Sequence, residues 1–144
     1  SQDSKFPLNI SARCQYACRA VVELAKNAAA GTPLTATSIA ERRDIPEKYL
    51  VHILLQLKRA GIVRSVRGAQ GGYLLAQSPE DISLLDITSA VDGPILDPLP
   101  VSGTETGDVQ IAWRAAADGI SEVLGSLSIK SILDQSAKPG MYYI

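Results

Sequence analysis

One stretch, residues 34–75, constrains the fold of this chain more than any other part of it. Its central part carries apolar residues at steps of three and four, which places them on one face of a helix: Tyr49, Leu50, Ile53, Leu54 and Leu57. Asp44 and Pro46 separate this helix from a shorter one before it. The shorter helix is expected to begin near Thr37 or Ser38, because a side-chain oxygen there can cap its start.

A β-hairpin is predicted directly after the second helix. Gly61 is placed to end that helix in a left-handed cap. The run 62–67 is β-like, residues 68–72 are a glycine-rich turn, and residues 73–75 return as a second strand. The order helix, tight turn, helix, hairpin is that of a winged helix-turn-helix, in which the second helix enters the DNA major groove and the hairpin lies along a neighbouring groove or the phosphates.

The candidate DNA-binding residues lie on these two elements and either offer donors or allow close backbone approach: Lys48, Tyr49, Gln56, Arg64, Ser65, Arg67 and Gly68. Lys48 and Gln56 could donate hydrogen bonds to base edges or phosphates. Arg67 stands close enough to the turn to reach into a narrow groove, and Gly68 lets the backbone approach a phosphate. The alternative is a helical hairpin beside a surface ribbon whose arginines are merely solvated.

The distribution of charge favours DNA binding, although the net charge of −1 does not. Residues 1–70 carry 11 Lys or Arg and 5 Asp or Glu, whereas residues 71–144 carry 3 and 10. Phosphate binding needs a locally basic face. The basic half contains the predicted winged helix-turn-helix, so we expect the acidic half to point away from DNA.

The only two cysteines, Cys14 and Cys18, fall on an amphipathic helix predicted over residues 10–27. A spacing of four places them on one face of that helix. They are interpreted either as a thiol pair or metal ligands, or as small residues of the core or a dimer interface. Two ligands alone do not close a typical zinc or cluster site. Two cysteines in such a chain suit a reducing cytoplasm.

Three segments resemble the Rrf family of bacterial winged-helix transcriptional regulators: ISARCQYACRAVVELA, the run from Ile45 through AGIVRSVRGAQGGYLLA, and ISLLDITSAVDGPI. The resemblance covers nearly the whole chain and implies a transcription factor and not an enzyme. Within that family the chain looks most like the cysteine-metabolism repressor. The loop over residues 93–108 has no cysteine, whereas cluster-binding members hold an iron–sulfur cluster there by three cysteines. No cofactor and no metal are therefore expected.

The resemblance also assigns an organisation to the chain. Residues 1–92 are the winged helix-turn-helix domain, residues 93–108 the loop, residues 109–136 a long dimerisation helix with a short packing helix, and residues 137–144 a C-terminal tail. The apolar pattern over residues 109–127 can fold onto the core or pair with its copy. A homodimer on a palindromic operator is expected, since two-fold symmetry matches such a site.

The tail carries the candidate partner-binding residues Met141, Tyr142, Tyr143 and Ile144. A terminal isoleucine offers a carboxylate beside an aliphatic side chain, which a pocket for an amino-acid carboxylate could capture. The tail is similar to those that enter O-acetylserine thiol-lyase, the cysteine synthase. The resemblance implies a repressor of cysteine metabolism that signals through this enzyme. The alternative is an arm packed on the dimer partner.

Three other functions stay open on the sequence: a sensor of a small ligand, a redox switch through Cys14 and Cys18, and an interaction protein without DNA binding.

Enzyme motifs such as a nucleophile elbow, a phosphate loop or HExxH do not occur. The residues at the start do not form a signal peptide, and no apolar run approaches the length of a membrane span. A cytoplasmic location is therefore expected.

Overall fold

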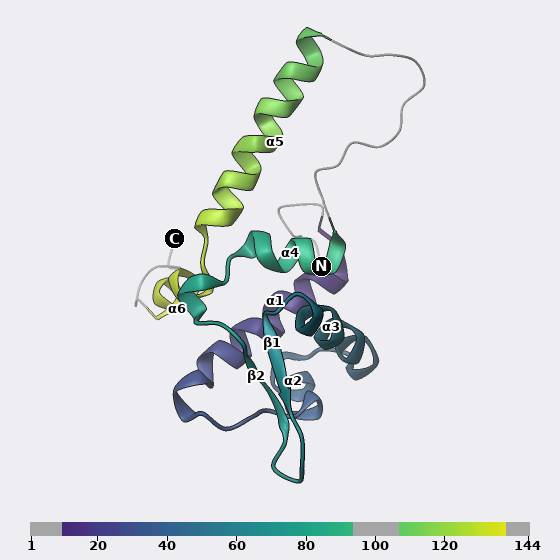
Figure 1. Cartoon of the computed structure of the whole chain (residues 1–144), viewed down its shortest axis with the longest axis vertical. Helices are drawn as coiled ribbons and strands as arrows, with labels where there is room; N and C mark the ends of the chain where they lie inside the picture. Colours follow the sequence, from purple (N-terminus) through teal and green to yellow (C-terminus); the bar gives the residue numbers. More distant parts are fainter. Residues whose placement is uncertain (1–9, 94–106, 138–144) are drawn as a thin grey trace.

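The computed structural model describes residues 10–93 and 107–137. This part of the chain is mainly helical with one antiparallel two-stranded sheet, as predicted (Figure 1). Its elements are α1 Ala12–Lys26, η2 Ala28–Ala30, α2 Ala36–Arg43, α3 Glu47–Arg59, β1 Val63–Val66, β2 Gly72–Leu75, η3 Pro79–Asp81, α4 Leu84–Asp92, α5 Asp108–Ser126 and α6 Ile129–Ser136. No helix within these residues is long and apolar enough to cross a membrane.

One hydrophobic core is shared by α1, α2, α3, α4 and α6. The apolar stripe predicted for α3 is confirmed for its four aliphatic members, Leu50, Ile53, Leu54 and Leu57, which are fully buried. Burial of each such side chain contributes about 1.5–3 kcal/mol to folding. Tyr49 was expected on the same stripe, but its side chain is 44% exposed. It lies one step beyond the buried face and packs against α1 instead.

The predicted start of α2 was wrong, because Thr35 and not Thr37 or Ser38 caps this helix. The Thr35 hydroxyl accepts a hydrogen bond of 3.1 Å from the amide of Ser38. The reason is a contact with the β1–β2 hairpin. The backbone of Leu34 forms a bridge with that of Tyr73, through hydrogen bonds of 3.0 and 2.7 Å. This bridge holds Leu34 extended, so the helix begins directly after Thr35.

Both ends of α3 are fixed by local backbone geometry. Asp44 adopts a left-handed conformation (φ 54°) in the turn after α2, and Pro46 is the N-cap of α3, one residue before the first helical position. Gly61 is left-handed as predicted (φ 77°), and the amide of Ile62 then donates to the carbonyl of Leu57 at 2.9 Å. That hydrogen bond satisfies one of the carbonyls left open at the helix end. The chain therefore turns sharply from α3 into β1.

The helix α5 projects away from the body of the molecule, on the side opposite the hairpin (Figure 1). Its C-terminal end is attached by two backbone hydrogen bonds, from Leu84 to the carbonyl of Leu127 (3.0 Å) and from Ile129 to the carbonyl of Ile82 (2.8 Å). Leu124 is the one buried residue of α5 in the single chain. The predicted packing helix, α6, begins after the N-cap Ser128 and buries Ile129 in the core.

Candidate nucleic-acid interface

The outer face of α3 lies opposite its buried face and carries Lys48, Val51, His52, Leu55 and Arg59, all of them exposed. We call this set the α3 outer face. It follows from the helical period, since burial of the aliphatic stripe turns these five side chains outward. Lys48, one of the predicted DNA-binding residues, is therefore placed where a groove could receive it.

A stacked array joins α1 to the start of α3. The rings of Tyr16 and Tyr49 are stacked with their centroids 6.3 Å apart and an interplanar angle of 19°. The guanidinium of Arg19 lies 5.3 Å from the Tyr16 ring centroid, and the ammonium of Lys48 lies 5.3 Å from that of Tyr49. Cations over aromatic faces are attracted by the ring quadrupole. The array therefore orients Tyr49 and Lys48 together. It could not be predicted, because Tyr16 and Tyr49 are far apart along the chain.

Arg19 also supports the turn between α2 and α3. Its guanidinium donates to the backbone carbonyls of Arg43 (3.4 Å) and Asp44 (3.3 Å). The Thr37 hydroxyl, which does not cap α2, instead donates to the carboxylate of Glu47 at 2.9 Å. These contacts fix the angle between the two helices, on which groove insertion depends. The sequence pattern alone does not single out Arg19, because the two carbonyls that it contacts lie on another element.

The wing is the β1–β2 hairpin, with Arg64 opposite Leu74 and Ser65 opposite Tyr73. The side chains of Arg64, Ser65 and Arg67 are exposed, and Gly68 has a positive φ of 107° at the tip. The tip extends from the body on the side away from α5 (Figure 1). The structure therefore brings the four predicted wing residues together on one exposed ribbon.

Two arginines before α3 are engaged within the protein. Arg42 and Arg43 form salt bridges with Glu23 of α1, at 3.3 and 3.6 Å. Their positions in the sequence are equally compatible with contacts to a DNA backbone and with solvated charges. Pairing with Glu23 reduces the local positive charge at this corner of the protein.

Two predicted DNA-binding residues of α3 do not lie on the α3 outer face: Tyr49, which packs against α1, and Gln56. The side chain of Gln56 is half-buried, and its amide nitrogen donates to the backbone carbonyl of Val91 in α4 at 3.3 Å. Its side-chain oxygen is buried without a hydrogen-bond partner. Gln56 therefore links α3 to the end of α4, a role that its position in the sequence could not indicate.

Cys14 and Cys18 lie one turn apart in α1. Cys14 is 1% exposed, and Cys18 is half-buried. Hydrogen bonding to Cys18, burial and the nearby carboxylate of Asp92 raise the pKa of the Cys14 thiol. The same hydrogen bond, with Cys14 as donor, lowers the pKa of Cys18. Of the two thiols, Cys18 is therefore the one disposed to form a thiolate.

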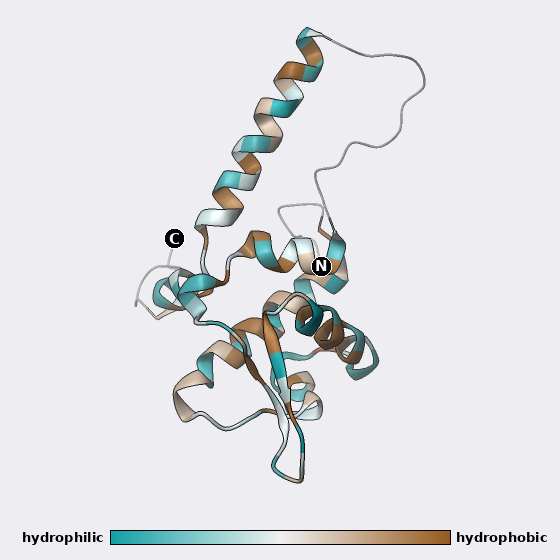
Figure 2. Ribbon diagram, viewed as in Figure 1, coloured by the Kyte–Doolittle hydropathy of each residue, from teal (hydrophilic) through white to brown (hydrophobic). Residues whose placement is uncertain are grey.

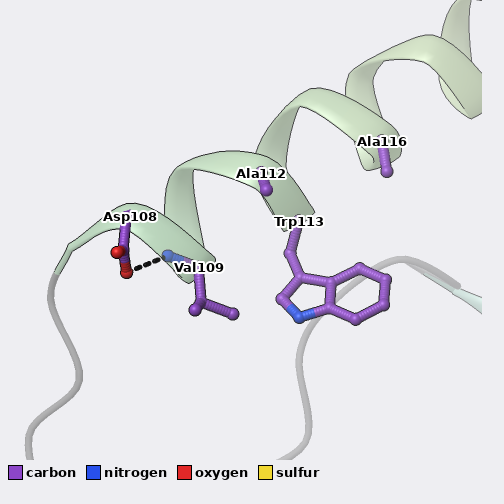
Figure 3. Close-up of a pocket in the computed structure, with 5 residues that line it drawn as sticks. All are labelled: Asp108, Val109, Ala112, Trp113 and Ala116. Carbon is purple, nitrogen blue, oxygen red and sulfur yellow. Dashed lines mark hydrogen bonds between the residues drawn. The ribbon is translucent and has the colours of Figure 1, made fainter.

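An apolar stripe runs along α5 and is largely uncovered in the single chain (Figure 2). Its exposed members are Val109 (56%), Trp113 (69%), Ile120 (45%), Val123 (57%) and Leu127 (38%). Near its N-terminal end, Asp108, Val109, Ala112, Trp113 and Ala116 line a shallow apolar groove (Figure 3). The predicted partner-binding residues Met141, Tyr142, Tyr143 and Ile144 and most of the loop, residues 94–106, lie outside the described residues.

The fold and this interface define a winged helix-turn-helix DNA-binding protein. A family model named Rrf2, described as an iron-dependent transcriptional regulator, matches residues 10–135. The chain belongs to the Rrf2 family of transcriptional regulators. The predicted family is confirmed, and with it a transcriptional regulator rather than an enzyme.

Individual relatives agree with this assignment. The chain is 34% identical to the HTH-type transcriptional regulator CymR of Bacillus subtilis, over 95% of this chain and 100% of that protein. The structure of CymR, the global cysteine regulator of that organism, superposes with a TM-score of 0.77 over 88% of this chain and 97% of the other. A putative Rrf2-like regulator of Rhodobacter capsulatus is 44% identical over 63% of this chain, but the match spans only 61% of that relative. The predicted likeness to the family's cysteine regulator is confirmed.

The family's description as iron-dependent raises the question of a metal group. Within the described parts, 10–93 and 107–137, no three His, Cys, Asp or Glu side chains come together as metal ligands. Both cysteines of the chain are on α1, and residues 94–106 contain neither cysteine nor histidine. The residues present do not fit a cluster that needs three or four thiolates. The predicted lack of a cofactor stays a prediction, to be checked by the iron content of the purified protein.

Proposed function

We propose that this regulator acts as a homodimer that inserts α3 into the major groove and lays the wing along the neighbouring backbone of a palindromic operator. The observation that carries the proposal is the α3 outer face beside the exposed basic wing. Lys48, Arg64 and Arg67 are exposed on these two elements. The uncovered stripe of α5 supplies a surface on which two copies could pair, and two-fold symmetry suits a palindromic site.

We further propose that the regulated process is cysteine metabolism and that the regulator is a repressor. Support comes from the 34% identity to CymR over the full length of that protein, and from the solved structure of CymR as the global cysteine regulator of B. subtilis. The absence of the three loop cysteines separates this chain from cluster-binding members of the family. A reducing cytoplasm suits a regulator that carries two unpaired thiols.

The signal in this proposal is a complex between the C-terminal tail and O-acetylserine thiol-lyase. Tyr142, Tyr143 and Ile144 form the aromatic-aromatic-isoleucine sequence on which it rests. A C-terminal isoleucine resembles a free amino acid in its carboxylate and its aliphatic side chain. A pocket that binds the substrate O-acetylserine would then also accept the tail. The substrate and the tail would compete, so the complex would report the supply of sulfur.

Calorimetric titration of the intact protein into O-acetylserine thiol-lyase tests this signal. We expect binding that is lost on deletion of Ile144 and is displaced by O-acetylserine. Lys130→Ala, a change on the exposed surface of α6, is the control and should bind as the unchanged protein does. Absence of any complex with the intact tail would overturn the partner and leave the DNA-binding function standing.

A second candidate signal is oxidation of the thiol pair, which the position of Cys14 and Cys18 one turn apart on α1 and the lowered pKa of Cys18 favour. Reaction of the Cys18 thiolate with a hydroperoxide would give a sulfenic acid and release the alcohol or water. Operator binding would then change on addition of hydrogen peroxide and would not change in the Cys14→Ser/Cys18→Ser variant. Equal sensitivity of both proteins would remove this candidate.

A further inference from the structure

The α3 outer face is unusual in its centre, where two aliphatic side chains are exposed side by side. Val51 is 54% exposed and Leu55 is 44% exposed, and a spacing of four places them one turn apart on the same side. Exposed cations stand before and after them on this face, Lys48 toward the N-terminus and Arg59 toward the C-terminus. An outer helix face is normally polar, so an apolar centre between two cations calls for an explanation.

The hydrogen-bonding capacity of this centre is limited to one side chain. His52 lies between Val51 and Leu55 in the sequence and is exposed, whereas Gln56 is occupied by its hydrogen bond to α4. A centre of this kind cannot read a run of guanine or adenine edges, which takes several Arg, Asn or Gln side chains. It can, however, make close apolar contacts.

The major groove offers one apolar group to such a centre, the C5-methyl of thymine. The cations at both ends suit the phosphates that border a groove, whereas an apolar protein partner would gain nothing from them. The pair is also too small to form a stable protein–protein interface by itself. Charge and size therefore both favour DNA as the occupant.

We propose that Val51 and Leu55 read thymine methyl groups, so that each operator half-site places A·T pairs against the middle of α3. The inference rests on the proposed insertion of α3 into the major groove and specifies what that helix recognises. Removal of one methyl from such a contact should weaken binding about fourfold, the value of a buried CH₂ group of about 0.8 kcal/mol. Contacts of the wing with the backbone should not respond to the methyl.

The test begins with selection of preferred sequences from a random duplex pool by the full-length protein. The selected duplex is then compared with copies in which deoxyuridine replaces thymidine at one position at a time, which removes the methyl and keeps the base pairing. We expect one or two positions in each half-site to lose about fourfold in affinity. In Val51→Ala or Leu55→Ala, the corresponding position should lose its preference for thymidine.

Arg67→Ala is the matched control, because it should weaken binding to every duplex and leave the effect of the methyl unchanged. Both apolar side chains are exposed, so their truncation should leave the melting temperature near that of the unchanged protein. If the selected duplex binds equally well with uracil at every position, or if the methyl effect persists in both alanine variants, the inference is wrong while DNA binding stands. If no duplex is bound in a salt-dependent way, the proposed insertion of α3 fails as well.

Discussion

The side-chain amide of Gln56 donates a hydrogen bond of 3.3 Å to the backbone carbonyl of Val91. Val91 lies in the last turn of α4, where helix carbonyls have no partner within the helix. Gln56, which lies in the last turn of α3, thus caps the end of α4. This hydrogen bond ties the proposed recognition helix to α4.

Replacement of Gln56 by Ala should therefore affect stability more than DNA binding. We expect the free energy of unfolding to fall by about 1 kcal/mol, because the carbonyl of Val91 loses its partner in a half-buried place. Urea denaturation at fixed protein concentration measures this. Gln135→Ala, which truncates an exposed glutamine of α6, is the control and should change stability little. Unchanged stability together with a large loss of operator affinity would return Gln56 to the DNA-contacting residues.

Replacement of Arg67 by Ala should weaken operator binding severalfold or more. The side chain is exposed next to the wing tip, and one lost phosphate contact should reduce the salt dependence of the affinity by about one unit of slope. Titration of a labelled duplex at several salt concentrations measures both. Lys130→Ala removes an exposed cation of α6 that pairs with Asp134, and it should leave affinity and slope unchanged. Equal affinity of Arg67→Ala and the unchanged protein would contradict the role of the wing.

Replacement of Gly72 by Ala should loosen the attachment of the wing to the body. An added Cβ would meet the carbonyl oxygen of Leu34 at 2.5 Å, and the backbone has a φ of +151° that other residues rarely adopt. The bridge between Leu34 and Tyr73 would have to open, so we expect a loss of roughly 1–3 kcal/mol in stability. Amide hydrogen exchange at Tyr73 should accelerate. Ala69→Ser, at the exposed tip of the same hairpin, should leave both quantities unchanged.

The elements of the fold could be predicted where the signal is local. The spacing from Leu50 to Leu57 and the glycine at position 61 predicted α3 and its end, because helical period and left-handed caps depend on near neighbours alone. The start of α2 could not be settled in this way, since Thr35, Thr37 and Ser38 are all competent caps. The choice of Thr35 follows from the bridge between Leu34 and Tyr73, which only the folded chain forms.

In the candidate site, too, the features that depend on local sequence could be predicted and those that depend on long-range contacts could not. Exposure of Lys48, Arg64 and Arg67 followed from pattern and turn position. The roles of Gln56 and Tyr49 did not, because their partners Val91 and Tyr16 are 35 and 33 positions away. Leu55 was passed over because an apolar residue in an amphipathic helix is normally assigned to the core. Long-range contacts decide whether a residue at the edge of an apolar helix face is buried or exposed, and a single sequence does not reveal these contacts.

The two thiols should differ in their reaction with iodoacetamide. The pKa of Cys18 is lowered by the hydrogen bond from Cys14, whereas that of Cys14 is raised and its side chain is buried. The thiolate is the reactive form, so Cys18 should be alkylated first as pH rises, and Cys14 should stay protected in the folded protein. Peptide mass spectrometry across pH measures the rates. Cys14→Ser keeps a hydrogen-bond donor at position 14 and should preserve the reactivity of Cys18. Cys14→Ala removes this donor, so the alkylation of Cys18 should shift to higher pH. Equal labelling of both cysteines would contradict the shared hydrogen bond.

Replacement of Trp113 by Glu should separate the proposed dimer. Trp113 is 69% exposed toward the N-terminal end of the apolar stripe on α5, and truncation of a buried interface tryptophan commonly raises a dissociation constant by about 30-fold or more. A buried carboxylate adds a desolvation cost. Ile111→Glu is the matched control: Ile111 is 71% exposed on the same helix, but the helical period places it on the opposite side from Trp113. Light scattering over a range of concentrations should show monomers for Trp113→Glu and dimers for Ile111→Glu. A monomeric unchanged protein, or equal behaviour of the two variants, would show that the stripe does not join two copies, and operator binding would then have to be explained by single winged-helix units.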